Sequence, residues 1–216
     1  MLPILVNLGP LTLHSYGVMA ALGFTAGILL SIYYALRYSI SIEMILNLAI
    51  YVMVSAIVGA RFFYVIGAWE QFAANPWEIF MVQNGGLVFL GGLLAAILVV
   101  YLYAQRHNLS LLNLLDVITP GTVLGEALGR VGCYLNGCCF GLPTQLPWGI
   151  KFPFGSLAYM YFPNEGLQPT QLIDVFGLLV IFIILIWLFR ARKFSGLPAG
   201  RQGQIFFWGL LLYSIE

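Results

Sequence analysis

Charged side chains are scarce in this chain, and their scarcity decides the class of protein. Only 8% of the 216 residues are charged, eight acids and nine bases. An ordinary soluble domain carries roughly 25% charged residues. So few charges could not cover the surface of a soluble globule in a chain that is 61% hydrophobic. The apolar surface must meet lipid, which excludes a soluble globular protein and predicts an integral membrane protein.

Other absences narrow the expected partners and domain organisation. The net charge is +1, and no basic cluster with interleaved aromatic residues occurs, so we expect no nucleic-acid partner. Linkers, low-complexity stretches and internal repeats are also missing, which predicts a single integral membrane domain over residues 1–216. The first apolar segment lacks a basic leader and is too long for a signal-peptide core, so we expect it to be a mature span.

Long apolar runs predict the number of spans. A helix needs about 20 mostly apolar residues to cross ~30 Å of hydrocarbon. Five runs qualify, at residues 11–36, 44–69, 79–104, 109–128 and 171–189. A sixth begins at Gln204, but its 13 residues to Glu216 would reach only about 20 Å as a helix. A charged end inside hydrocarbon is costly, so we expect the chain to be cut short at its C-terminus. The predicted fold is an all-α, polytopic transmembrane helical bundle of five full spans and part of a sixth.

Basic residues predict the orientation of these spans. They follow the first, third and fifth runs, as Arg37, Arg106, Arg190, Arg192, Lys193 and Arg201. The connection after the second run contains Glu70 and Glu78 but no base. Because short cytoplasmic loops are enriched in Lys and Arg, we expect the N-terminus outside. Residues 129–170 would then form an outward-facing signature loop and small head segment.

The chemically unusual residues are concentrated between residues 129 and 141. This stretch reads G-R-V-G-C-Y-L-N-G-C-C-F-G and contains four glycines, Arg130, Asn136 and all three cysteines. Glycine lets backbone approach a ligand closely, and the planar guanidinium of arginine suits a phosphate. An arginine at the end of a membrane helix therefore indicates a functional site. The alternative is a snorkelling arginine beside glycines that allow tight helix packing.

These residues resemble the signature of the prolipoprotein diacylglyceryl transferase family, G-R-x-G-N-F-x-N-x-E-x-x-G. The positions that match are Gly129, Arg130, Gly132, Asn136 and Gly141. Four other stretches resemble family motifs in the same order: L-H-x-Y-G at 13–17, G-x-R-x-x-Y at 59–64, the two Gly-Gly-Leu steps at 85–93, and P-[ST]-Q-L at 169–172. Tyr213 is similar to the family's late tyrosine, whose companion arginine would follow beyond Glu216. The resemblance covers essentially the whole chain.

The sequence also departs from the family pattern. Cys133 and Cys138 replace the signature's asparagine and glutamate, which we interpret as a cysteine-bearing variant. Leu90 replaces a histidine that is the family's candidate for proton handling, and leucine cannot move a proton. Gln168 replaces another histidine. If the reaction needs a base, Tyr16 or His14 is what the sequence leaves.

The resemblance implies a transferase of the bacterial plasma membrane, with its active site toward the outer side. It would move the diacylglyceryl group of phosphatidylglycerol onto the lipobox cysteine thiol of a lipoprotein precursor, with no cofactor and no metal. The implied catalytic residues are Arg130, Tyr16 and His14. The implied substrate-binding residues are Arg130, Asn136, Gly141, Arg61, Tyr213, Gly129 and Gly132. Arg130 would clamp the leaving phosphate, and membrane lipid would surround the site.

Alternative roles remain open for several of these residues. Arg61 could pair with a helix-facing acid such as Asp116 or Glu126, Tyr16 could belong to an interfacial aromatic belt, and His14 could be a satisfied polar group. The C-x4-C-C spacing is poor for zinc. A disulfide from Cys133 to either neighbouring cysteine is possible on an oxidising face.

Two alternative functions also remain. A catalytically silent relative that binds lipid would explain Leu90. A small membrane transporter would also contain intramembrane arginines and glycine-rich helices, although such folds usually show internal repeats.

Overall fold

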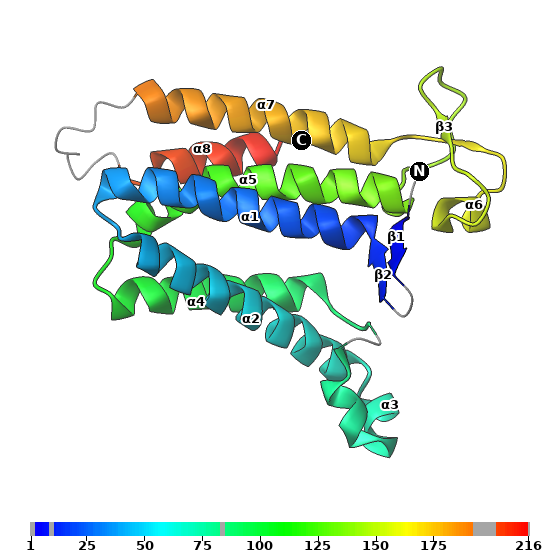
Figure 1. Ribbon diagram of the computed structural model, residues 1–216, viewed down its shortest axis with the longest axis horizontal. Coiled ribbons are helices and arrows are strands. Elements are labelled where there is room, and N and C mark those ends of the chain that lie inside the picture. Colours follow the sequence, from blue (N-terminus) through cyan, green and yellow to red (C-terminus); the bar gives the residue numbers. More distant parts are fainter. Residues whose placement is uncertain (1–2, 9–10, 83–84, 192–201, 216) are drawn as a thin grey trace. The chain divides into compact units, whose positions relative to one another are not determined.

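The computed structural model describes residues 3–8, 11–82, 85–191 and 202–215, and within them the fold is helical (Figure 1). Five helices in the described part of the chain are long and apolar enough to cross a membrane. They are α1 (Ser15–Ala35), α2 (Ile42–Gly67), α4 (Phe89–Arg106), α5 (Leu111–Asn136) and α7 (Thr170–Ala191). The shorter apolar helix α8 spans Gln204–Tyr213. The prediction of a helical membrane bundle is therefore confirmed.

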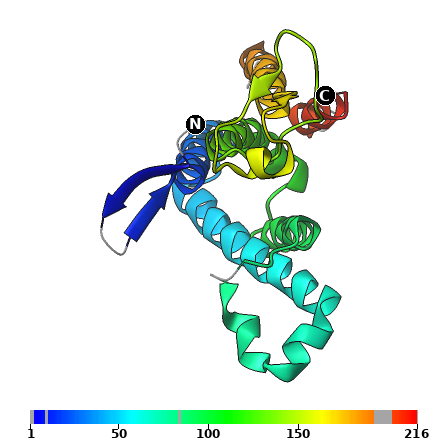
Figure 2. The same ribbon diagram turned by 90° about the vertical axis from the view of Figure 1, so that its right-hand side faces the viewer.

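The chain forms two compact units. One comprises Met1–Tyr34 and Leu115–Glu216, and the other comprises Ala35–Leu114. In the first unit, α1, α5, α7 and α8 lie side by side in both ribbon views (Figures 1 and 2). The second unit is built on the pair α2 and α4, with the 3-10 helix η1 (Leu36–Tyr38), the short helix α3 (Trp69–Ala74) and the 3-10 helix η2 (Pro76–Phe80).

Glycines bring α1 and α5 into close contact in the first unit. A Cβ at Gly23 would lie 2.6 Å from the carbonyl oxygen of Gly125, and one at Gly27 would lie 2.8 Å from that of Gly121. Between lipid-exposed helices, apolar burial gives little net driving force, so close backbone approach through small residues is a main source of association. Tyr34 of α1 also stacks on Phe189 of α7, with ring centroids 3.9 Å apart.

The N-terminus of α8 is fixed by a buried carboxylate of α5. The two oxygens of Asp116, which is fully buried, accept hydrogen bonds from the backbone N–H groups of Gly203 and Phe206, each at 3.0 Å. Free N–H groups at a helix start favour a negative charge. Asp116 therefore acts as a cap for α8 within the first unit, one of the roles that its place near a helix end allows.

Small residues also join the helices of the second unit. A Cβ at Gly59 of α2 would lie 2.5 Å from the carbonyl oxygen of Gly91 on α4, and one at Gly92 would lie 3.0 Å from that of Ala56. The buried hydroxyl of Tyr103 donates a 3.0 Å hydrogen bond to the carbonyl of Met44. The same device therefore packs both units.

Among the described residues, two short antiparallel strand pairs lie outside the spans. Strands β1 (Ile4–Leu8) and β2 (Leu11–His14) pair directly before α1. Strands β3 (Ile150–Lys151) and β4 (Gly166–Leu167) pair in the segment between α5 and α7, which also contains the short helix α6 (Leu157–Tyr161). Phe152, Ala158 and Leu167 form a small buried cluster there. This segment thus has its own apolar core.

Three element boundaries differ from the predicted ones by four residues or more. The first span begins at Ser15 because residues 11–14 form a strand. The third begins at Phe89 because η2 and irregular backbone, with positive φ at Gly85 and Gly86, precede it. Helix α5 continues to Asn136, through the part of residues 129–170 that the sequence assigns to a loop. Glycine normally destabilises a helix by about 1 kcal/mol, but here Gly121, Gly125 and Gly132 pack against α1, and that packing favours helix.

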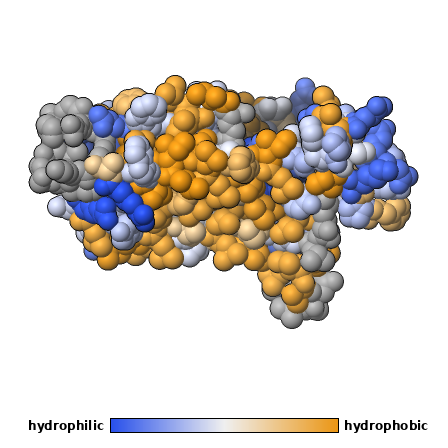
Figure 3. All heavy atoms as spheres, turned by 90° about the horizontal axis from the view of Figure 1, so that it is seen from above, coloured by the Kyte–Doolittle hydropathy of each residue, from blue (hydrophilic) through white to orange (hydrophobic). Residues whose placement is uncertain are grey.

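The described basic residues lie where the sequence places them. Arg37 is in η1, Arg106 ends α4, and Arg190 is in the last turn of α7. Arg192, Lys193, Arg201 and Glu216 lie outside the described residues. On the face shown in Figure 3, hydrophobic residues cover the middle and hydrophilic residues gather toward both ends. This pattern fits a protein that crosses a membrane several times.

Candidate functional site

Arg130 lies on α5 between two carboxylates. Its Nη1 is 3.1 Å from an oxygen of Asp174 on α7, and its Nη2 is 3.9 Å from an oxygen of Glu126. The Arg130 side chain is 34% exposed, so the guanidinium is partly open. A guanidinium has five N–H donors in a fixed fork, and these two contacts engage only part of that set. Arg130 is therefore oriented by acids while it can still meet another anion.

A small cavity opens beside this guanidinium. It has a volume of about 170 Å³ and is lined by Glu126, Arg130, Asp174, Leu178 and Tyr213. Complete pockets for drug-sized ligands measure about 300–1,000 Å³. The cavity could therefore hold the polar part of a lipid, while larger apolar groups would have to lie outside it.

Tyr213 completes the polar lining of this cavity. Its hydroxyl donates a 2.9 Å hydrogen bond to the Glu126 oxygen that also faces Arg130. Glu126 and Arg130 are four residues apart on α5, a spacing that places both side chains on one helix face. The chain thus brings together one guanidinium, two carboxylates and one phenol from α5, α7 and α8.

Tyr16 lies next to the signature segment at the start of α1. A Cβ at Gly132 would be 3.3 Å from the Cα of Tyr16 and 3.4 Å from its ring. A Cβ there would also lie 3.0 Å from the Cβ of Met19, so the absence of a side chain at Gly132 helps α1 to approach α5 closely at that turn. Tyr16 is itself 47% exposed, so its ring rests against the backbone of α5 and keeps a free side.

Comparison with known proteins shows the family of the chain. The family model described as prolipoprotein diacylglyceryl transferase matches residues 3–216. The chain belongs to the prolipoprotein diacylglyceryl transferase family. The resemblance inferred from the motifs is thereby confirmed.

Several relatives cover nearly the whole chain. A phosphatidylglycerol–prolipoprotein diacylglyceryl transferase of Synechococcus elongatus is 36% identical over 91% of this chain and 68% of its own length. The enzyme of that name from Finegoldia magna is 34% identical over 93% of this chain and 74% of its own length. The one from Nostoc sp. is 32% identical over 99% of this chain and 75% of its own length.

The remaining residues of the family signature occupy different environments. Asn136 ends α5 and is half-buried. A Cβ at Gly129 would meet no atom within 4 Å, whereas one at Gly141 would lie 2.8 Å from Thr170 and 2.9 Å from Gln168. Gly141 also donates its N–H to the carbonyl of Gln168 at 3.0 Å. The space at Gly141 is therefore filled by the chain leading into α7, while the surface at Gly129 is open.

Arg61, the second arginine of the family motifs, has a different environment. It is 7% exposed, and its N–H groups donate to five backbone carbonyls. The acceptors are Ile79 (2.9 Å), Gly85 (2.6 Å), Gly86 (3.2 Å), Met81 (3.3 Å) and Glu78. These bonds account for all five donors of the side chain. Within its unit, Arg61 holds the segment after α3 against α2, and its described partners are carbonyls, not the acids Asp116 or Glu126.

His14, one of the two candidate bases, does not line the Arg130 cavity. It ends β2 and is exposed. Leu90, at the family's histidine position, lies in the first turn of α4 and is 54% exposed. The carboxylates that do line the cavity, Glu126 and Asp174, were not predicted as partners of Arg130. The four-residue spacing of Glu126 and Arg130 was a usable signal, whereas the contact with Asp174 depends on how α7 packs.

The three cysteines form a second cluster at the end of α5. Cys133 is buried, Cys138 is half-buried, Cys139 is exposed, and all three are free thiols. Burial of the sulfur and the neighbouring Cys138 thiol raise the pKa of Cys139. A protonated thiol is a poor nucleophile, so Cys139 is not poised for attack.

Proposed function

We propose that this chain transfers the diacylglyceryl group of phosphatidylglycerol to the lipobox cysteine thiol of a prolipoprotein, using the cavity beside Arg130. Membership of the family and the names of its relatives support the reaction and both substrates. The observation that carries the choice of site is the guanidinium of Arg130, oriented between two carboxylates and open to a cavity of about 170 Å³.

The bonds that change define what the site must do. The substrate sulfur forms a bond to the terminal glycerol carbon of the diacylglyceryl group, and the bond from that carbon to the phosphate oxygen breaks. A thioether forms, glycerol phosphate leaves with the electron pair, and the thiol proton goes to a base. The leaving phosphate gains charge in the transition state, so a preorganised cationic donor accelerates the reaction.

Arg130 is the donor that we assign to this phosphate. Its contact with Glu126 is the longer of its two ion pairs, 3.9 Å against 3.1 Å for Asp174. An incoming phosphate would displace the weaker partner first. Asp174 would then keep the guanidinium in position while the freed fork faces the head group. Asn136, Gly129, Gly132 and Tyr16 would shape the adjoining surface of α1 and α5, with Tyr16 orienting the head group.

Glu126 is the acceptor that we assign to the thiol proton. Leu90 cannot take a proton, and His14 is not among the lining residues. Once phosphate replaces Glu126 at Arg130, the carboxylate loses its ion pair, and its oxygens face the cavity where the thiol would bind. Tyr213 donates to the same oxygen and would keep it aimed into the cavity.

The location of the site follows from the substrates. Both are lipid-embedded, so a cavity on the face of helices that cross a membrane can receive them laterally. We place the protein in a bacterial plasma membrane with the N-terminus outside, because the described basic residues Arg37, Arg106 and Arg190 end alternate spans. The start of α7 and the end of α5 would then face outward.

Reconstitution tests this proposal directly. The purified chain in phosphatidylglycerol vesicles should convert a lipobox peptide to its thioether, detected by the mass gain of one diacylglyceryl group. The same peptide with serine in place of cysteine should not react, and vesicles of phosphatidylcholine should give no product. Lipid and peptide binding without any mass gain would instead identify a catalytically silent relative. The transporter alternative is not favoured by the comparisons.

A further inference from the structure

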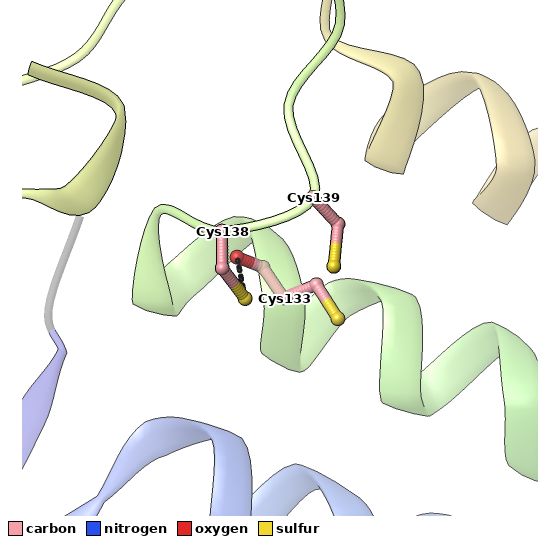
Figure 4. A group of neighbouring side chains, drawn as sticks. All are labelled: Cys133, Cys138 and Cys139. Atoms are coloured by element: carbon pink, nitrogen blue, oxygen red, sulfur yellow. Dashed lines mark hydrogen bonds between the residues drawn. The ribbon is translucent and has the colours of Figure 1, made fainter. Parts of the chain in front are cut away.

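The three cysteines bring their sulfur atoms to one place. Cys133 comes from the last turns of α5, and Cys138 and Cys139 come from the chain that leaves that helix (Figure 4). All three Sγ atoms lie within 4.8 Å of one another. They are the only cysteines in the chain. The proposed transfer reaction uses the thiol of the substrate and none of these three cysteines, so it does not explain why they cluster.

Specific contacts hold the backbone of this cluster. The N–H of Cys138 donates to the carbonyl of Cys133 at 3.1 Å, which closes the turn after α5. The Nε2 of Gln171, a fully buried residue of α7, donates to the carbonyl of Cys138 at 2.7 Å. The hydroxyl of Thr170 donates to the carbonyl of Cys139 at 2.9 Å. These bonds fix the backbone from which the side chains of Cys138 and Cys139 extend.

Backbone conformation points the last sulfur back toward the others. Cys139 has a φ of 59°, in the left-handed region that residues other than glycine, asparagine and aspartate rarely adopt. Such a conformation costs roughly 1–3 kcal/mol and persists where the surroundings enforce it. Here it turns the chain so that the side chain of Cys139 faces the end of α5 (Figure 4).

The spacing and the donors favour a metal ion over a disulfide. Metal–thiolate bonds of about 2.3 Å in a trigonal arrangement place sulfurs about 4.0 Å apart, so sulfurs within 4.8 Å need only a small movement. A disulfide requires an S–S distance of about 2.05 Å and would leave the third sulfur unused. Among the described residues, the group contains no histidine or carboxylate. Three sulfurs without nitrogen or oxygen select a soft ion.

We propose that Cys133, Cys138 and Cys139 bind one Cu(I) ion in a three-coordinate thiolate site. Zinc prefers four ligands, whereas three sulfurs can satisfy a monovalent soft cation. Each thiol that binds loses its proton to solvent, so binding is favoured by higher pH. The exposed Cys139 gives the ion a route to the buried Cys133. This inference does not rest on the proposed transfer reaction.

Competition for copper tests the site in the intact chain. The purified, reduced protein in detergent micelles should take one equivalent of Cu(I) from the chelator bicinchoninate, measured by loss of the coloured chelate. X-ray absorption should show three sulfurs at about 2.3 Å. Bound Cu(I) should also protect all three thiols from alkylation by a maleimide, counted by mass spectrometry.

Single substitutions test each ligand. Cys133→Ser, Cys138→Ser and Cys139→Ser should each weaken Cu(I) binding by more than the roughly 10- to 100-fold lost with an outer-shell partner. Leu142→Ser changes an exposed side chain of the same loop without removing a sulfur, and should bind as the parent does. Circular dichroism checks that each variant is folded.

Three results would overturn the proposal. Bicinchoninate could retain all the copper, or Zn(II) could displace Cu(I) at equal free concentration. Alternatively, the protein isolated without reductant could show one alkylatable thiol, rising to three after reduction, with no metal present. That last result would assign the cluster to a disulfide.

Discussion

The guanidinium of Arg130 contacts two carboxylates at unequal distances, and the contribution of each carboxylate can be tested by substitution. Asp174 is the closer partner, at 3.1 Å, and both side chains are partly exposed. Ion pairs of this kind contribute only about 0–1 kcal/mol to stability. The pairing therefore matters mainly for where the guanidinium points.

Asp174→Asn should separate positioning from stability. Asparagine keeps the shape of aspartate but not its charge, so Arg130 loses its closest anchor. We expect kcat/KM for transfer to fall about tenfold, because the variant loses an ion pair that contributes up to ~1 kcal/mol and also loses the alignment of the guanidinium. The melting temperature in detergent should change little. Glu43→Gln, on exposed α2 surface, is the control. Unchanged kcat/KM in the Asp174 variant would remove the aspartate from the site.

Arg61 donates to five backbone carbonyls, and the contribution of these bonds to stability can be tested. Arg61→Lys replaces a five-donor fork by an ammonium with three donors, so at least two of the five carbonyl bonds are lost. Hydrogen bonds to charged groups contribute about 1.5–3 kcal/mol each. Loss of one such bond would accelerate amide exchange in residues 85–88 roughly 10- to 100-fold, so the loss of two should accelerate it by at least about 100-fold.

Hydrogen–deuterium exchange with peptide resolution measures this effect. Arg106→Lys, at an exposed helix end, is the matched control and should leave the exchange of residues 85–88 unchanged. Identical exchange in the two variants would show that the carbonyl contacts of Arg61 do not stabilise the segment.

At the scale of elements, glycine spacing explains why α1 and α5 pack together. Gly23→Ala would place a methyl 2.6 Å from the Gly125 carbonyl, whereas Gly17→Ala in the same helix meets no atom within 4 Å. Overpacking costs typically 1–3 kcal/mol, and an unobstructed Gly→Ala change gains up to about 1 kcal/mol of helix propensity. Gly23→Ala should therefore destabilise the protein, whereas Gly17→Ala should not.

Denaturant unfolding in mixed micelles, followed by circular dichroism, measures that difference. We expect Gly23→Ala to lower the free energy of unfolding and Gly17→Ala to leave it equal or raised. Equal values for both variants would contradict the packing account.

The elements also show what sequence can and cannot predict. Apolar run length identified all five long helices because the hydrocarbon thickness fixes the length of a span. Boundaries were missed where packing overrides propensity, as in the glycine-rich end of α5. The family motifs singled out Arg130, but no spacing rule could bring Asp174 or Tyr213 beside it, because those contacts depend on the packing of α7 and α8.

At the scale of the whole molecule, the orientation of the spans predicts which loops are accessible. Cys139 is exposed beyond the end of α5, on the side that we assign to the exterior. In intact spheroplasts, after reduction and copper chelation, a membrane-impermeant maleimide should label Cys139.

A matched cysteine on the opposite side tests the same assignment. His107→Cys, in a background where the three native cysteines are serine, should be labelled only after permeabilisation, because His107 follows α4 at its basic end. The reverse labelling pattern would invert the orientation.

The central claim is that Arg130 clamps the leaving phosphate, and the rate of single-turnover transfer tests it most directly. In phosphatidylglycerol vesicles with a lipobox peptide, Arg130→Ala should slow thioether formation by about 100- to 1,000-fold, the cost of one preorganised donor. The rate of Arg130→Lys should lie between those of Arg130→Ala and the parent, because lysine keeps the positive charge but lacks the planar guanidinium that can bind two phosphate oxygens. Arg106→Ala should react at the parent rate. A folded Arg130→Ala variant that reacts within a few-fold of the parent would contradict the account.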